Sequence, residues 1–409
     1  MINSHHRGED RLENYIKQNG KLKLPDRFQV LKIKEDEYKL VSLHESLGFH
    51  VDSQVSIILD LILPQLQRGS TLDEIQQSVN PQMWPVALDM LKDLADRGLV
   101  KNDTTPQWWE SIPQDEKETY TGQIRFFSNF RMLGEKPVAG ESQGIAETNF
   151  LAQQKLKESR ILIIGLGRVG SRLACGLAQA GVGTIYGSDP GRLELGNSLD
   201  SAYSSSDAGE SREMLLEKSI IKANPYVKYT PLGAASLFDK GLEALPADLD
   251  LLVLCEEHFS PDHIEKINRI CLETGLVWIS YRNFGHRFEI GPMVVPHETA
   301  CYRCLELRRM ANNPSYDDLL KTQRSMFDHN MALGALNITS GYELLAVEVI
   351  KILTNFSRPL TYSSVYTFDL ASFEGKFHPV LKIPRCPVCG GPSRDRPSVR
   401  IWDLNELLD

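Results

Sequence analysis

The chain has 409 residues, of which 42% are hydrophobic and 24% are charged, and its formal net charge is −9. This composition excludes a disordered chain and predicts a folded protein of two or three domains. The negative charge argues against binding to nucleic acid or to an anionic membrane surface, and no apolar run approaches the roughly 20 residues that span a bilayer. No signal peptide is visible at the N-terminus, so a cytoplasmic location is expected.

The first hundred residues predict three short strands followed by three helices. Apolar residues alternate in the strand-like runs and then recur at helical spacing. Such an order of elements predicts a small winged-helix-like domain over residues 1–102, followed by a connector at 103–145 and a larger domain at 146–409. The predicted strands are 28–34, 38–43 and 47–51, and the predicted helices are 55–69, 71–79 and 85–98.

The larger domain begins with a continuous apolar run at 161–164, which is typical of a strand buried on both faces of a sheet. Strands and helices then alternate, and this predicts an α/β fold with a doubly wound parallel sheet. After Arg287 the pattern changes to longer alternating strands and one long helix at about 332–353. The predicted strands are 160–165, 183–188, 227–231, 249–255 and 276–281, with helices at 169–180, 209–224 and 261–274.

A glycine-rich turn follows the first of these strands and opens a helix. Gly165, Gly167 and Gly170 have the spacing of a Rossmann-type nucleotide turn, in which the helix N-terminus offers free N–H groups to a phosphate. Asp189 lies 19 residues beyond Gly170, at the end of the next predicted strand, where an acid accepts a hydrogen bond from a ribose hydroxyl. The motif alone leaves open a nicotinamide-dependent oxidoreductase and a scaffold whose turn binds nothing.

Two cysteine pairs give the strongest chemical signal in the sequence. Cys301 and Cys304 form one pair, and Cys386 and Cys389 form the other. Two such pairs close a tetrahedral zinc site with four thiolates and leave no open position, so a structural metal is expected rather than a catalytic one. The alternative is two reduced pairs without metal.

The order of these parts over about residues 145–395 resembles the ThiF-like family of ubiquitin-activating-type adenylating enzymes. The resemblance rests on the Gly165 turn, Asp189, a helix ending in Ala-Asn-Pro at 223–225, the long helix and the two cysteine pairs. It implies a homodimer that binds ATP, activates a carboxylate as its acyl-adenylate and contains a structural zinc.

The chain departs from the family pattern where the family has charged residues that bind ATP. This chain has Gly191 where the family has a second Asp, Asp200 where it has an Arg, and Glu210 where it has a Lys. It has Glu256 or Glu257 where the family has an Asp after the fourth strand. Because acids in place of cations repel a triphosphate, ATP is expected to be an unlikely ligand and the chain is expected not to be catalytic alone. Arg192 and Arg212 are the two cations that would compensate, and they keep an adenylating enzyme as the alternative.

The whole chain resembles the leader-peptide-binding partner of thiazole/oxazole-modified microcin (TOMM) cyclodehydratases, with an N-terminal recognition element for ribosomally synthesised, modified peptides (RiPPs). The resemblance implies that a leader peptide adds a strand beside 47–51 and packs against the helix at 84–94. The alternative is that these residues only form the domain's core. The residues expected to bind the peptide are Leu47, Phe49, Val51, Trp84, Leu88 and Leu91.

These expectations define a leader-peptide-binding scaffold. It would present a ribosomal precursor peptide to a separate YcaO cyclodehydratase, which forms azolines during bacteriocin-type RiPP biosynthesis. The main alternative is an ATP-dependent enzyme that adenylates a peptide carboxylate. DNA binding is disfavoured because the predicted winged-helix-like domain has a net charge of −2.

Overall fold

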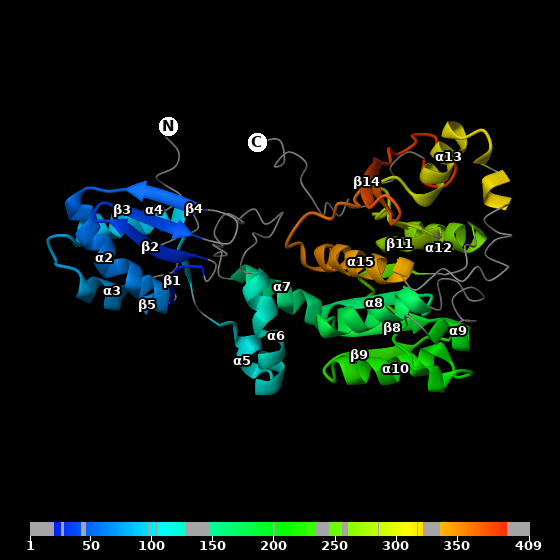
Figure 1. The fold of residues 1–409 in the computed structure, drawn as a ribbon, viewed down its shortest axis with the longest axis horizontal. Coiled ribbons are helices and arrows are strands. Elements are labelled where there is room, and N and C mark those ends of the chain that lie inside the picture. Colours follow the sequence, from blue (N-terminus) through cyan, green and yellow to red (C-terminus); the bar gives the residue numbers. More distant parts are fainter. Residues whose placement is uncertain are drawn as a thin grey trace. The chain divides into compact units, whose positions relative to one another are not determined.

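The computed structural model describes residues 20–25, 28–41, 46–96, 99–102, 105–127, 147–198, 201–233, 245–255, 261–284, 286–316, 318–321 and 336–390. The chain divides into two compact units, Met1–Gln154 and Lys155–Asp409 (Figure 1). Each unit is described by itself. The finer division at residues 102 and 145 stays a prediction.

The N-terminal unit contains the three strands and three helices that the sequence predicts. The strands form an antiparallel sheet in the order β2-β3-β4. Their bounds are β2 (Gln29–Lys34), β3 (Glu37–Val41) and β4 (Ser46–His50), and the helices are α2 (Ser53–Arg68), α3 (Leu72–Ser78) and α4 (Trp84–Asp96). The comparison of this unit with a winged helix stays a prediction.

Local chemistry fixes where these helices begin and end. Gly69 has a φ of +80° directly after α2, a left-handed conformation that favours glycine. Thr71 and Glu74 form the predicted capping box, in which each side chain accepts a hydrogen bond from the other residue's backbone N–H. The helices then bury their apolar faces against the sheet, with Tyr38 and Leu40 of β3 in the same core as Ile62 of α2.

Two further parts of the N-terminal unit were not predicted. A second sheet has the order β5-β1-β6, with strands of only two or three residues that show no periodicity. Two helices follow it within the predicted connector, and Trp109 packs edge-on against Phe150 at ring centroids 5.5 Å apart. The bounds of these parts are β1 (Lys21–Lys23), β5 (Ser70–Thr71), β6 (Lys101–Asn102), α5 (Gln107–Ser111) and α6 (Gln114–Phe127). The helix α7 (Glu147–Glu158), which carries Phe150, begins in this unit and ends in the next.

The C-terminal unit is built on a sheet of eight described strands in the order β14-β13-β12-β11-β10-β7-β8-β9. The five strands from β11 to β9 run parallel, and β12, β13 and β14 extend the sheet in antiparallel pairs. This confirms the predicted large parallel sheet. The strands are β7 (Arg160–Ile164), β8 (Thr184–Ser188), β9 (Lys228–Pro231), β10 (Leu251–Leu254), β11 (Trp278–Phe284), β12 (Arg287–Ile290), β13 (Ser364–Asp369) and β14 (Glu374–Pro379).

Helices cover both faces of this sheet. α8 packs against both α10 and α15, whereas α12 packs with α13 (Figure 1). The connections through α8 and α10 step along the sheet in one direction and the connection through α12 steps in the other, so the usual right-handed crossover puts α12 on the opposite face from α8 and α10. The helices are α8 (Arg168–Gln179), α9 (Leu195–Ser198), α10 (Arg212–Ala223), α12 (Pro261–Thr274), α13 (Tyr302–Asn312) and α15 (Leu336–Thr354), with a 3₁₀ turn η1 (Ser205–Asp207).

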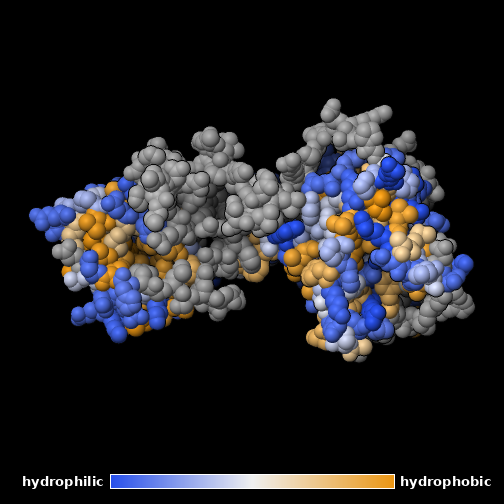
Figure 2. Space-filling model, turned by 90° about the horizontal axis from the view of Figure 1, so that it is seen from above, coloured by the Kyte–Doolittle hydropathy of each residue, from blue (hydrophilic) through white to orange (hydrophobic). Residues whose placement is uncertain are grey.

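The surface is mixed in polarity. Figure 2 shows hydrophobic side chains in patches on both units, interrupted by hydrophilic ones. Among the described residues, no helix combines the length and the apolar character needed to cross a bilayer.

Candidate nucleotide site and cysteine cluster

The glycine-rich turn lies at the point where the order of the parallel strands reverses. The chain passes from β7 to β8 on one side, whereas β10 lies on the other side of β7. Ligands of open α/β sheets bind outside the carboxyl ends of the strands at such a point. The turn that the sequence predicts therefore has the position of a ligand site.

The glycines of the turn are required by its geometry. Gly165 has a φ of +84°, and its N–H donates to Ser188 O at 3.0 Å. A Cβ added at Gly170 would lie 1.9 Å from Gly165 O, so only glycine permits this approach of helix to strand. Gly167 is the N-cap of α8 and supplies no side chain to the first N–H groups. The turn thus offers backbone donors to an anion.

Asp189 holds the turn from the end of β8. Its Oδ2 accepts a hydrogen bond from Leu166 N at 2.7 Å, and its Oδ1 accepts one from Gly191 N at 2.7 Å. The side chain is only 6% exposed. The predicted ribose-binding acid is therefore part of the scaffold of the turn.

Arg212, the first residue of α10, places a cation beside this acid. Its Nη1 lies 3.3 Å from Asp189 Oδ2, and the side chain is 12% exposed. Its Nε is buried without a hydrogen-bond partner among the described residues. A Cβ at position 191 would lie 3.3 Å from Arg212 Cζ and Nη1. Glycine at this position, where the family has a second Asp, therefore leaves room for the guanidinium. Arg192, the other predicted cation, is exposed and donates to Gly209 O at 2.8 Å.

Two buried residues that the sequence analysis missed support the turn. Tyr203 donates through its hydroxyl to Leu166 O at 2.7 Å, and burial raises the pKa of this hydroxyl. Glu213 accepts hydrogen bonds from Asp189 N at 3.0 Å and Gly233 N at 3.2 Å, and burial raises its pKa as well. The sequence offered one signal for Glu213, which is that a polar residue occupies a helical position that otherwise belongs to the core.

The remaining departures from the family pattern are four acidic residues, of which the structure describes one. Asp200, Glu256 and Glu257 lie outside the described residues. Glu210 is described and lies on the surface, where it pairs with Lys218 at 3.1 Å.

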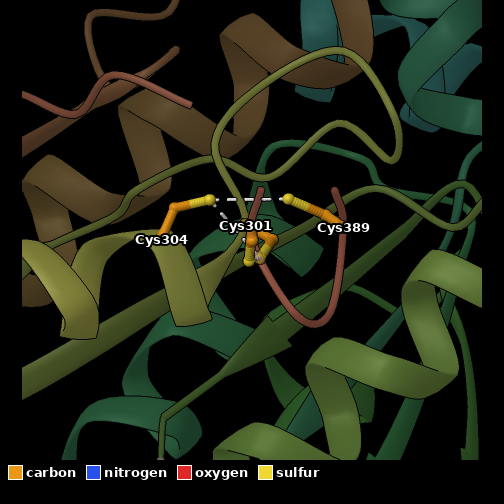
Figure 3. A group of neighbouring side chains, drawn as sticks. Cys301, Cys304 and Cys389 are labelled. Atoms are coloured by element: carbon orange, nitrogen blue, oxygen red, sulfur yellow. Dashed lines mark hydrogen bonds between the residues drawn. The ribbon is translucent and has the colours of Figure 1, made fainter. Parts of the chain in front are cut away.

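The four predicted metal ligands come together although 82 positions separate the two pairs. Their ligand atoms all lie within 4.8 Å of one another, with Cys304 Sγ 3.4 Å from Cys389 Sγ and Cys301 Sγ 3.8 Å from Cys386 Sγ. In Figure 3 the sulfur atoms of Cys304 on α13 and Cys389 on the C-terminal loop point toward each other. A tetrahedron of thiolates about 2.3 Å from zinc has edges of similar length, so the cluster fits a zinc ion.

The loop of the second pair is shaped for metal binding. A Cβ at Gly390 would lie 2.4 Å from Cys386 N, so the tight loop requires glycine there. The N–H of Ile383 donates to Cys304 Sγ at 3.4 Å, and such a bond stabilises a thiolate. Four thiolates would fill a zinc ion's coordination, which suits a structural role.

A mostly buried ion network ties the cysteine-bearing helix α13 to the sheet. Glu289 of β12 binds Arg309 of α13 at 2.7 Å and Arg282 of β11 at 3.3 Å. Arg309 also contacts Glu306 at 3.3 Å, and Glu306 accepts a hydrogen bond from Tyr316. Burial alone would raise the pKa of Glu289, but the two guanidinium groups lower it overall.

The residues expected to bind a peptide lie around β4 and α4. β4 is an edge strand that pairs only with β3 among the described strands, and Leu47 and Phe49 lie opposite Leu40 and Tyr38 in that pairing. The side chains of Leu47 and Phe49 are outside the described part. Val51, Trp84 and Leu88 are partly buried against the core, and Leu91 is 0% exposed within it. Their contacts with a peptide stay a prediction.

The fold and this turn define a Rossmann-type α/β protein with a glycine-rich turn at the switch point of its parallel sheet. The ThiF family matches residues 139–388, so the chain belongs to the ThiF family. A relative from Escherichia coli (strain K12), the sulfur carrier protein ThiS adenylyltransferase, is 28% identical over 246 residues, which cover 59% of this chain and 90% of the relative. The molybdopterin-synthase adenylyltransferase of the same organism is 25% identical over 243 residues, covering 59% and 91%.

Solved structures resemble a larger part of the chain. Escherichia coli MccB with AMPCPP and MccA has a TM-score of 0.65 at 18% identity and covers 91% of this chain and 100% of its own. PaaA has a TM-score of 0.62 at 17% identity and covers 88% and 100%. At these identities the likeness establishes the fold alone.

The predictions that the chain is not catalytic alone and that ATP is an unlikely ligand are wrong. The relatives are named adenylyltransferases, and MccB has been solved with ATP, which together point to a catalytic, ATP-using protein. The predictions compared charges position by position along the sequence. The fold instead brings Arg212 from the start of α10 to the turn, so the site retains a cation.

Proposed function

We propose that the chain is an ATP-dependent adenylyltransferase that activates a carboxylate of a peptide. One observation carries the proposal: the glycine-rich turn lies at the switch point of a ThiF-family sheet with the Arg212 cation beside it. The named activity of its relatives supports this reading over the scaffold role that the sequence predicts.

The reaction joins a carboxylate to the nucleotide. A carboxylate oxygen attacks the α-phosphorus of ATP, the bond from that phosphorus to the bridging oxygen breaks, and pyrophosphate leaves as the acyl-adenylate forms. The N–H groups of the turn hold phosphate oxygens, and the Arg212 guanidinium offsets negative charge that develops on the pyrophosphate. Burial of these donors in a partly dry site strengthens both interactions.

The peptide class of the substrate rests on the N-terminal unit and on MccB, which has been solved with its MccA precursor peptide. β2 and β4 are the two edges of the three-stranded sheet, but a register shift between Lys32 and Lys34 interrupts β2. A bulge and lysines discourage strand addition, so β4 is the edge better suited to an extended peptide. We assign leader capture to β4 and the half-buried residues Trp84 and Leu88 of α4.

The predicted homodimer and the predicted YcaO partner are not needed for this chemistry. Both stay predictions from the resemblance, and no contact among the described residues favours a YcaO partner over adenylation by the chain itself.

Exchange of labelled pyrophosphate into ATP tests the proposal on the full chain. Precursor peptides encoded beside its gene serve as the carboxylate substrate, and exchange is expected only when a peptide is added. Leu88→Ser should weaken peptide binding, whereas Ile57→Ser, at an exposed position of α2, should leave it unchanged. Absence of exchange with every such peptide, at ATP concentrations that saturate related enzymes, would refute adenylation. Equal effects of Leu88→Ser and Ile57→Ser would refute the assignment of the peptide site.

A further inference from the structure

Leu166 of the glycine-rich turn is held by hydrogen bonds at both of its backbone groups. Its N–H donates to Asp189 Oδ2 at 2.7 Å, and its carbonyl accepts from the Tyr203 hydroxyl, also at 2.7 Å. The end of β8 supplies the first partner, whereas Tyr203 comes from the segment between α9 and η1. The same hydroxyl lies 3.3 Å from Arg212 O, so Tyr203 contacts both the turn and the start of α10.

The segment that carries Tyr203 is fixed to the two helices beside the turn. Ala202 N donates to Ser171 Oγ of α8 at 3.1 Å, and Ser219 Oγ of α10 donates to Ala202 O at 3.1 Å. Tyr203 is buried, and burial raises the pKa of its hydroxyl, so the hydroxyl keeps its proton and remains a donor. The fold therefore sets both the position of this hydroxyl and its role as a donor.

The direction of the Leu166 carbonyl determines what the next N–H faces. The Leu166–Gly167 peptide bond is trans, so its C=O and its N–H point in opposite directions. A carbonyl turned to Tyr203 therefore turns the Gly167 N–H away from Tyr203. Gly167 is the N-cap of α8, where the N–H groups are the donors that the proposed function gives to phosphate.

Glycine at position 167 makes rotation of this peptide plane easy. Gly167 has a φ of −69°, and rotation by half a turn would bring φ into the positive range, which glycine adopts about as readily. The rotation would put the Leu166 carbonyl oxygen where the N–H was, and a carbonyl oxygen repels an anion. It would also break the 2.7 Å hydrogen bond and leave the buried Tyr203 hydroxyl without this acceptor, so Tyr203 opposes it.

We infer that Tyr203 is a positioning residue for nucleotide binding, which holds the Leu166–Gly167 peptide so that the Gly167 N–H faces the phosphates. The inference rests on the proposed function and adds a residue that acts through the turn. Because the bond concerned is made to a phosphate, its loss should weaken ligands that carry phosphates and spare the adenosine part. A hydrogen bond to a charged group corresponds to about tenfold in affinity or more.

Tyr203→Phe removes the hydroxyl, keeps the ring and tests this role in the full chain. Calorimetric titration gives the affinity for ATP, and inhibition of pyrophosphate exchange gives the affinities for inorganic tripolyphosphate and adenosine. ATP and tripolyphosphate should both bind about tenfold more weakly, whereas adenosine should change by less than about twofold. The KM for ATP should rise by the same factor as the dissociation constant, with kcat unchanged, since the phosphate contact is made in the ground state and the transition state alike.

Tyr316→Phe is the matched control. Tyr316 is also a buried tyrosine of the C-terminal unit, and its hydroxyl donates to Glu306 on α13, so the substitution should leave all three affinities unchanged. An unchanged affinity for ATP in Tyr203→Phe, or an equal loss of affinity for adenosine, would overturn the inference and leave adenylation intact. Failure of the unsubstituted chain to bind ATP would refute the proposed function and the inference together.

A second variant covers the case in which Tyr203→Phe does not fold. Ser219→Ala keeps the Tyr203 hydroxyl but removes one of the two hydrogen bonds that fix Ala202. It should weaken ATP and tripolyphosphate together, by a smaller factor than Tyr203→Phe, and leave adenosine unchanged. A folded Ser219→Ala chain with unchanged affinity for ATP and tripolyphosphate would overturn the inference.

Discussion

Arg212 Nη1 lies 3.3 Å from Asp189 Oδ2, and the two side chains are 12% and 6% exposed. The pair joins the start of α10 to the end of β8, immediately beside the glycine-rich turn. Its cation occupies space that a side chain at position 191 would restrict. The glycine-rich turn therefore has a cation beside it, although position 191 carries no acid.

Replacement of this cation should weaken nucleotide binding specifically. Arg212→Met is expected to raise the KM for ATP at least tenfold, since a charged contact in a partly buried site contributes about 1.5 to 3 kcal/mol. Arg212→Lys should retain part of the affinity. Arg192→Met is the control, because Arg192 is exposed and its guanidinium donates to Gly209 O. Equal KM values for Arg212→Met and the unsubstituted chain would exclude a role for Arg212 in ATP binding.

Two glycines of the same helix should respond in opposite ways to alanine. Gly170→Ala places a Cβ 1.9 Å from Gly165 O, so the turn must open and ATP affinity should fall more than tenfold. In Gly176→Ala the added Cβ meets no atom within 4 Å, so this substitution should stabilise the fold by about 0.5 to 1 kcal/mol. Calorimetric titration and thermal melting measure both effects. Normal ATP affinity in Gly170→Ala would contradict the geometry of the turn.

The cysteine cluster predicts a zinc-dependent fold. Cys386→Ser should abolish stoichiometric zinc and lower the free energy of unfolding by several kcal/mol, because a structural metal stabilises only the folded state. Cys175→Ser should change neither the zinc content nor the free energy of unfolding, since Cys175 lies outside the cluster. Metal analysis and thermal melting provide the measurements. Full zinc content in Cys386→Ser would rule out the four-thiolate site.

The ion network around Glu289 predicts a dependence of stability on pH. The folded pKa of Glu289 lies below its ordinary value of 4.5, so its ionised form contributes stability above that pH, and the contribution is lost as the pH falls. Glu289→Gln removes the acid that lies between Arg282 and Arg309, of which Arg309 retains Glu306, and should lower the free energy of unfolding by about 3 kcal/mol at neutral pH. The difference from the unsubstituted chain should shrink in acid.

Glu374→Gln on β14 is the matched control for that network. Its carboxylate pairs with Lys376 at 2.8 Å, but both side chains are largely exposed. Removal of such a surface pair should change the free energy of unfolding by less than about 1 kcal/mol. Denaturant unfolding at several pH values compares the two variants, and a pH-independent loss in Glu289→Gln would contradict the assigned role of its charge.

The sequence predicted those features that a short local pattern of residues indicates. The apolar run at 161–164 predicted a doubly buried strand, and thiol spacing predicted that Cys301 and Cys386 would meet despite their separation. The sequence named Arg192 and Arg212 as compensating cations but could not choose between them, because that choice depends on how closely α10 approaches the end of β8. The short strands β1, β5 and β6 were missed because two or three residues show no periodicity.

The incorrect prediction about ATP has the same origin. A comparison of charges by position treated Gly191 and Glu210 as losses, but the fold uses Gly191 to admit a guanidinium and leaves Glu210 on the surface with Lys218. Charge arguments at a ligand site therefore need the packing of the elements that meet there.

Exchange of radiolabelled pyrophosphate into ATP by the purified full chain, with and without a precursor peptide, tests the central claim most directly. The account predicts peptide-dependent exchange that Arg212→Met reduces at least tenfold at subsaturating ATP. No exchange, together with no ATP binding by calorimetry in the folded and zinc-loaded chain, would contradict it.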